Sequence, residues 1–185
     1  MDELKRRGHA LEEKFFADQD AKVVAQLREK LEKQELTKAL AEHTGIENAE
    51  LLEGMVALGV SVPTLVVIRI IPLVLMSWAS GRVESNEREV LMNHLHSKNI
   101  GVDSPVRSLI NGWLDQQPES SLEATWTEFM NAYLPTLDAS AKDQLKSEVL
   151  SLATDIAEAD GGFLGFGSVS QSEKDLKVRL EAVFA

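Results

Sequence analysis

Cysteine is absent from this chain of 185 residues, and proline occurs only five times. The lack of cysteine excludes disulfide scaffolds, thiol nucleophiles and thiolate metal sites. The prolines and the eleven glycines stand mainly between apolar segments rather than inside them. Few segments alternate in the manner of strands, and helical periods dominate. We therefore predict an all-α protein, built as a single compact multi-helix domain of two similar helical halves with an N-terminal helical extension.

Basic residues are in deficit, and the formal net charge is -11. Binding to nucleic acid through phosphate neutralisation needs a basic face, so this class of function is not expected. Residues 108–141 contain no lysine or arginine but five acids. Such a surface favours cations or a protein partner with a basic surface, although it also serves solubility. The five acids are Asp115, Glu119, Glu123, Glu128 and Asp138.

Long hydrophobic runs are also scarce. The longest covers residues 65–79 and is interrupted by Arg69 and Pro72. A membrane-spanning helix needs about 20 apolar residues, so we expect no transmembrane segment. We predict the central helix of a bundle, buried all round and kinked at Pro72, with Arg69 paired to a carboxylate or reaching the surface. A membrane-peripheral scaffold that uses this run is an alternative.

The N-terminal residues are rich in charge and show no apolar core of a signal peptide, so a cytoplasmic location is expected. Residues 2–43 are predicted to form one or two amphipathic helices, because Val24, Leu27 and Leu31 follow a helical period. This apolar stripe is short and irregular for a coiled coil, so it is expected to pack on the body or to contact a partner. We place a helical segment at 1–47 and the main domain at 48–185, with Gly45 as the C-cap of the first unit.

Further helices are predicted from the same periodicity and from capping signals. Pro63 suits a first helical turn, with Ser61 or Val62 at the cap, and the pair Ser104 and Pro105 opens another helix. The predicted helices outside the apolar run cover residues 48–58, 85–98, 104–115, 121–134, 138–159 and 171–184.

Two corners of the chain share a layout. "WASGRVESNE" at 78–87 and "AEADGGFLGFGSVSQSE" at 157–173 each end a helix at a small residue, pass through a Gly-x-Val step and reach a glutamate four residues after the valine. Ser170 and Glu173 fit a capping box, and Glu87 falls in a first helical turn, where the helix dipole favours an acid. Helix capping therefore explains both glutamates without a ligand.

The same carboxylates also suit a hard cation. Calcium and magnesium bind carboxylate and carbonyl oxygens, and a glycine-rich loop can offer free carbonyls. The second corner lacks the alternating acids of an EF-hand and the glycine spacing of a dinucleotide fingerprint. If a cation binds, we predict a calcium or magnesium site at Asp160 and Glu173, with help from Glu87.

The stretches "LGV…TLVVIRIIPLVLMSWASGRVESNEREVL", "WLDQQP" and "AEADGGFLGFGSVSQSE" resemble the bacterial TerB-like tellurite-resistance superfamily, in a branch with an added N-terminal helical segment. The resemblance implies an all-helical domain of two similar halves, a divalent-cation site at the acidic corners, and a role in tellurite or chemical-stress response. Glu87 matches the family glutamate, and Asp160 and Glu173 match acids that an insert separates. Ser80 stands where the family usually has aspartate, which removes one negative charge from the first corner.

No catalytic signature appears in the sequence. His94 and His96 are two residues apart on a predicted helix, so they point to different faces and do not suit one metal ion there. We therefore predict a non-enzymatic interaction or cation-sensing module. The alternatives are a metal-dependent hydrolase that uses the corner carboxylates, and the membrane-peripheral scaffold described above.

Overall fold

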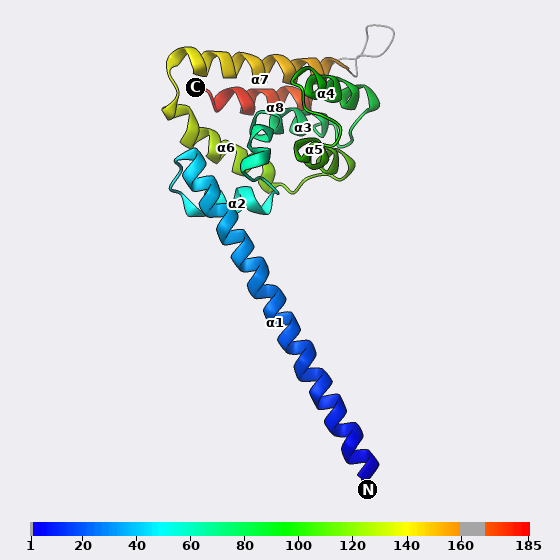
Figure 1. Cartoon of the computed structure of the whole chain (residues 1–185). Helices are drawn as coiled ribbons and strands as arrows, with labels where there is room; N and C mark the ends of the chain where they lie inside the picture. Colours follow the sequence, from blue (N-terminus) through cyan, green and yellow to red (C-terminus); the bar gives the residue numbers. More distant parts are fainter. Residues whose placement is uncertain (1, 160–168) are drawn as a thin grey trace.

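The computed structural model describes residues 2–159 and 169–185, with side chains from Lys22 onward. Within these residues the secondary structure is entirely helical, which confirms the predicted all-α class. A compact body of helices holds the C-terminus, and one long helix, α1, projects from it to the distant N-terminus (Figure 1).

Helix α1 runs without a break over Asp2–Thr44. It ends at Gly45, whose φ of +72° is readily adopted by glycine, and the Gly45 N–H donates to the carbonyl of Ala41 at 2.9 Å. Only the C-terminal part of α1 packs on the body, where Leu40 is fully buried and the helix contacts α2 (Ala49–Ala57) and the 3₁₀ helix η1 (Val62–Arg69). The predicted C-cap is therefore confirmed, and the one or two expected helices are one.

Helix α2 covers Ala49–Ala57, and its N-cap Asn48 accepts a hydrogen bond from the Leu51 N–H at 3.1 Å. The chain then turns at Gly59, which has a φ of +82°. A Cβ at this position would stand 3.1 Å from Leu109 Cδ1, so the turn also brings the backbone close to α5 (Pro105–Asp115). The two ends of α2 are thus set by residue types that can be recognised in the sequence, an N-cap asparagine and a turn glycine.

The apolar run is divided into two helices, which corrects the prediction of one central helix buried all round. The 3₁₀ helix η1 covers Val62–Arg69 and the α-helix α3 covers Ile71–Ser77. Pro72 lies in the first turn of α3 and has no N–H to offer the carbonyl of Ile68, four residues earlier. The indole N–H of Trp126 donates to that carbonyl instead, at 2.9 Å. The break is therefore stabilised by a side chain of α6 (Ser121–Tyr133).

Arg69 reaches the surface from the end of η1 and lies 3.8 Å from the carboxylate of Glu148. The sequence predicts either an exit to the surface or a carboxylate partner for this arginine, and the structure shows both. Val66 is also exposed, at 46%, so η1 buries only one of its faces.

No single helix among the described residues is long and apolar enough to cross a membrane, and α2 with η1 reaches the required length only as a pair bent by 90°.

The remaining α-helices lie within one or two residues of their predicted bounds, and a short 3₁₀ helix, η2, which the sequence does not predict, follows α6. Helix α7 lies across one side of the body and contacts α3, α4 and α8, and α6 contacts α2 and α3 (Figure 1). Their bounds are α4 Ser85–Ser97, α5 Pro105–Asp115, α6 Ser121–Tyr133, η2 Leu134–Thr136, α7 Ala139–Ala159 and α8 Gln171–Ala182.

Candidate functional site

The first corner joins α3 to α4. Gly81 has a φ of +93°, and its N–H donates to the carbonyl of Trp78 at 2.8 Å. The indole N–H of Trp78 donates to the carbonyl of Trp113 at 2.7 Å, which ties the corner to α5. Ser80, at the position where an acid was expected from the resemblance, is exposed and donates its hydroxyl to the carbonyl of Arg82 at 3.0 Å. This corner is therefore held by backbone geometry and one tryptophan.

Glu87 is only 1% exposed although it is an acid near a surface loop. Its Oε2 accepts a hydrogen bond from the backbone N–H of Glu84, the N-cap of α4, at 2.8 Å. The carboxylate lies in the first turn of the helix, where the exposed N–H groups favour negative charge. Glu87 thus closes the N-terminus of α4, as its position in the sequence predicts.

Glu173 plays the same part at the start of α8 and is 5% exposed. Its Oε2 accepts from the Ser170 N–H at 2.5 Å, while the Ser170 hydroxyl accepts from the Glu173 N–H at 3.2 Å. The predicted capping box is confirmed with both of its bonds.

The first corner contacts the start of the second corner, at the C-terminal end of α7. The side-chain amide of Asn86 donates to the carbonyl of Ala159, at the end of α7, at 3.3 Å. Asp160, the other predicted ligand, follows Ala159 directly and lies outside the described residues. Among the residues that are described, no group of three or more His, Asp or Glu side chains is placed to hold a metal ion. The calcium or magnesium site at Asp160, Glu173 and Glu87 remains a prediction, as does the hydrolase alternative.

His94 and His96 differ in their surroundings, as their spacing on one helix requires. His94 is half-buried and His96 is exposed. Burial lowers the pKa of His94, and the charge of Lys98 lowers it further, against the opposite effect of Glu148. The neutral imidazole is therefore the form that the folded protein favours at His94.

Glu148 on α7 connects three elements of the body. Lys98 Nζ, just after α4, lies 2.6 Å from its carboxylate, and Arg69 from η1 lies 3.8 Å away. The hydrogen bond from Lys98 is the main reason why the pKa of Glu148 is below its usual value, with burial opposing the shift. This cluster links η1, α4 and α7 near the surface, and each ion pair in it is expected to contribute only modestly to the free energy of unfolding.

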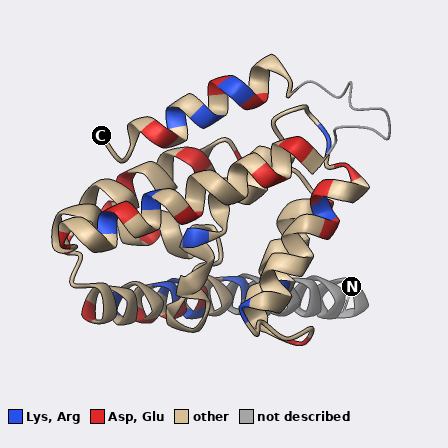
Figure 2. Ribbon diagram, turned by 90° about the horizontal axis from the view of Figure 1, so that it is seen from above, with Lys and Arg blue, Asp and Glu red and all other residues tan. Residues whose placement is uncertain are grey.

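Residues 108–141 present less free negative charge than the sequence suggests. Asp115 pairs with Arg88 at 2.5 Å, and Glu123 receives two hydrogen bonds from Arg179 at 2.7 and 3.2 Å. Asp138 accepts the N–H of Ala141 at 2.8 Å and so caps α7. Figure 2 shows lysine and arginine interspersed with the acids along the helices. Only part of the negative charge of residues 108–141 is therefore free to attract a basic partner.

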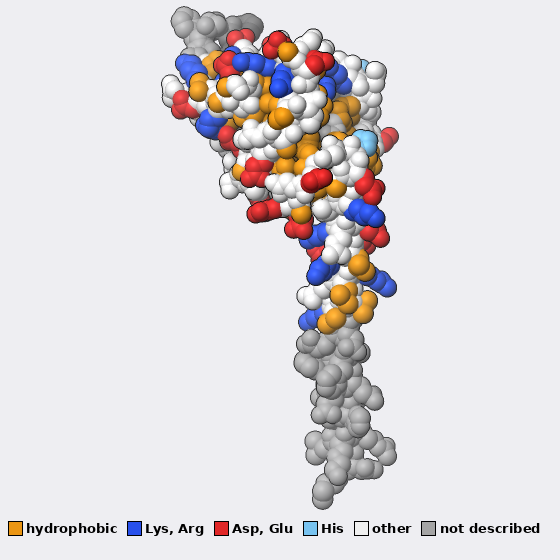
Figure 3. All heavy atoms as spheres, turned by 90° about the vertical axis from the view of Figure 1, so that its left-hand side faces the viewer, with side chains coloured by type: hydrophobic (Ala, Val, Ile, Leu, Met, Phe, Trp, Pro, Cys, Tyr) orange, Lys and Arg blue, Asp and Glu red, His pale blue; other side chains and the backbone are white. Residues whose placement is uncertain are grey.

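The apolar face of α1 is exposed, and the sequence alone did not decide whether this face packs on the body or stays free. Val23, Val24, Leu27 and Leu31 have exposed fractions between 48% and 59%. We call these four residues the α1 stripe. Figure 3 shows hydrophobic side chains gathered on the projecting helix, just beyond the charged residues near the body. The helical spacing of the stripe was visible in the sequence, but its separation from the body was not.

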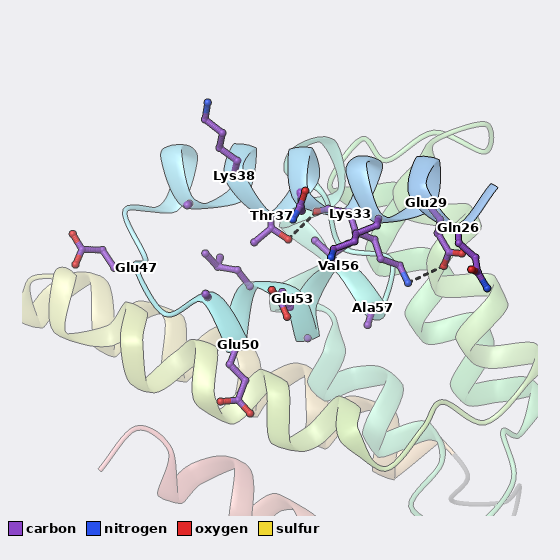
Figure 4. A pocket seen from close by; sticks show the side chains of 16 residues that line it. Gln26, Glu29, Lys33, Thr37, Lys38, Glu47, Glu50, Glu53, Val56 and Ala57 are labelled. Carbon is purple, nitrogen blue, oxygen red and sulfur yellow. Dashed lines mark hydrogen bonds and ion pairs between the residues drawn. The ribbon is translucent and has the colours of Figure 1, made fainter. Parts of the chain in front are cut away.

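A groove of about 900 Å³ lies between α1 and α2. Its lining includes Lys33 and Thr37 from α1 and Glu53 and Val56 from α2. In Figure 4, Thr37 and Glu53 lie toward the space between the helices, whereas Lys38 points away from it. Lys33 is held by Glu29, one turn earlier, at 2.9 Å. The groove is thus lined by both polar and apolar side chains, and it lies beside the α1 stripe.

Comparison of the chain with protein-family models, with curated proteins and with solved structures finds no match in any of the three. The TerB-like resemblance therefore remains a prediction from the sequence.

Proposed function

We propose that this chain is a non-enzymatic protein-interaction module, in which the helical body holds α1 out as a docking helix. One observation carries the proposal. Among the described residues, five of the eight large hydrophobic side chains that are exposed belong to α1. A concentration of apolar surface on one projecting element is typical of a binding face. The body supplies a rigid base, and the helix supplies the contact.

The spacing of the α1 stripe matches a known mode of recognition. Val24, Leu27 and Leu31 stand at i, i+3 and i+7, the pattern by which an amphipathic helix anchors in a partner. Fully burying a leucine or valine side chain contributes roughly 1.5–3 kcal/mol. Because these residues are about half exposed, burial by a partner recovers a substantial part of that free energy.

Charge near the stripe indicates the chemistry of the partner. Residues 22–38 carry five basic and three acidic side chains within a chain whose net charge is -11. Across the groove, Glu47, which precedes α2, and Glu50 and Glu53 of α2 are exposed. We expect the partner to present an apolar face to α1 and basic groups toward α2. The resemblance to TerB-like proteins supports placing this interaction in a cytoplasmic response to tellurite or other chemical stress.

Capture experiments with two matched substitutions test the proposal. Leu27→Lys places a charge in the stripe, and Val178→Lys does the same at an exposed valine of α8. Proteins retained from a cell extract by the wild-type chain are expected to be retained by Val178→Lys and reduced at least tenfold by Leu27→Lys. The retained amount is expected to fall with added salt, because the charged contacts are at the surface.

Equal retention by all three chains would overturn the proposal. Circular dichroism and thermal unfolding of both variants serve as the control for folding. Since both substituted residues are exposed, neither change is expected to disturb the core.

A further inference from the structure

Three of the four residues of the α1 stripe have, over a short length, the spacing of a coiled-coil seam. Val24, Leu27 and Leu31 alternate three and four residues apart, which places them at positions a, d and a of a heptad. Gln34 occupies the next d position and Lys38 the next a position. The seam is therefore apolar over a short length and ends in polar layers close to the body.

The seam lies beside the contacts that α1 makes with the body, and Gln34 and Lys38, which continue it, line the groove toward α2. An α-helix turns about 100° per residue, so Leu40, which is fully buried against the body, lies about 140° around the helix from Leu27. Thr37, which lines the groove toward α2, lies about 80° from Leu27. Ala39 and Glu42 are exposed on the free side. A second helix can thus lie along the stripe with its own body directed outward.

The charges that flank the seam select one arrangement. In a parallel pair in register, a residue at position g faces the residue at position e of the other helix, five positions later. Lys30 is at position g and Glu35 at position e, so each helix sets Lys30 against Glu35 of its partner. Neither residue forms an ion pair with another described residue of its own chain. The two opposite charges are therefore available for a contact between chains.

An antiparallel pair lacks this complementarity. It sets g positions against g positions, and from 23 to 37 these are Val23, Lys30 and Thr37, none of which is acidic. Lys30 then finds no carboxylate across the seam. The parallel arrangement is the one that satisfies both the apolar stripe and the charges beside it.

We propose that the α1 stripe binds a second copy of this chain, and that the two α1 helices pair in parallel and in register as a short two-stranded coiled coil. The proposal rests on the function proposed above and specifies its partner. With so few apolar layers, the pairing is expected to be weak and reversible. The two bodies lie at the same end of the paired helices.

The absence of cysteine from the chain makes a single introduced thiol a clean reporter. In the parallel arrangement, Leu31 of one chain faces Leu31 of the other, within the span that a disulfide bridges. Mild oxidation of Leu31→Cys is expected to yield mainly disulfide-linked dimer. Glu32→Cys, about 100° further around the helix, is the matched control and is expected to remain mostly monomeric. Equal cross-linking of the two variants would overturn the proposal.

Charge exchange tests the flanking pair by sedimentation equilibrium. Lys30→Glu and Glu35→Lys each set like charges across the seam, and each is expected to weaken self-association about fivefold or more. An equimolar mixture of the two variants restores both attractive pairs and is expected to associate at least as well as the wild type. A mixture that associates no better than its components would contradict the parallel pairing.

The outcomes also separate this proposal from the broader one. A wild-type chain that sediments as a monomer at every concentration overturns self-pairing. If Leu27→Lys still abolishes capture of a different protein, the docking function of α1 stands with another partner. If Leu27→Lys changes neither self-association nor capture, both proposals are wrong.

Discussion

Glu87 and Glu173 are buried acids whose carboxylates are engaged by backbone N–H groups at the starts of α4 and α8. Their spacing after a Gly-x-Val step was sufficient to predict the caps, because capping depends on local sequence. A cation site that joins Asp160 to them depends instead on tertiary arrangement, which local sequence does not specify.

Substitution of Glu173 measures the contribution of the cap. Glu173→Ala removes the acceptor for the Ser170 N–H and is expected to lower the free energy of unfolding by about 1 kcal/mol. Glu173→Gln retains an acceptor and is expected to lose less. Urea unfolding monitored by circular dichroism gives both values, with Lys174→Ala at the exposed neighbouring position as the control. An unchanged stability in Glu173→Ala would show that the cap contributes nothing.

His94 gives the body a predictable dependence on pH. Because burial holds its pKa below the ordinary value of 6.5, the unfolded chain binds a proton more readily than the folded chain. The free energy of unfolding is therefore highest above about pH 6.5, and it decreases progressively as the pH falls toward the folded pKa of His94. The carboxylate of Glu148, with a pKa below 4.5, adds a loss of the same sign only at lower pH.

Thermal unfolding between pH 7.5 and 5.5 tests this expectation. The midpoint of the wild type is expected to fall with pH, and that of His94→Gln to fall less. His96→Gln, at an exposed position of the same helix, is expected to follow the wild type. If His94→Gln retains the full slope, the titrating group is not His94.

At the scale of elements, the caps and turns placed most helix bounds, whereas the division of the apolar run was missed. The sequence predicts a kink at Pro72 within one helix, but the preceding segment is a 3₁₀ helix that ends at Arg69. Apolar periodicity does not distinguish a 3₁₀ helix from an α-helix over eight residues in a run that is almost wholly apolar. The hydrogen bond from the Trp126 indole to the Ile68 carbonyl joins residues far apart in the sequence, so no local sequence pattern predicts it.

The turn between α3 and α4 depends on one glycine. Gly81 adopts a φ of +93°, where a side chain is strained, although no neighbour would touch its Cβ. Gly81→Ala is expected to lower the free energy of unfolding by about 1–2 kcal/mol. Gly101→Ala, also in an open loop but outside the left-handed region, is expected to change stability little. Equal effects of the two substitutions in chemical denaturation would contradict the backbone argument.

At the scale of the whole molecule, the sequence predicted the spacing of the α1 stripe and left its location open. A helix with such a stripe either folds back on the body or projects, and the choice depends on the turn at Gly45 and on packing by residues distant in sequence. The acidic segment shows the same limit. Arg88 and Arg179 neutralise two of its acids from other helices, which a count of local charge does not reveal.

Hydrogen exchange along α1 tests most directly whether the stripe is a docking surface. A helix that projects alone opens readily, whereas one paired through its apolar face is protected. We predict that amides of residues 22–36 in the full chain exchange more slowly as protein concentration rises, and that Leu27→Lys abolishes this protection while leaving the body unchanged. Exchange in this segment that is independent of concentration and equal in the two chains would contradict the account of α1 as a self-docking helix.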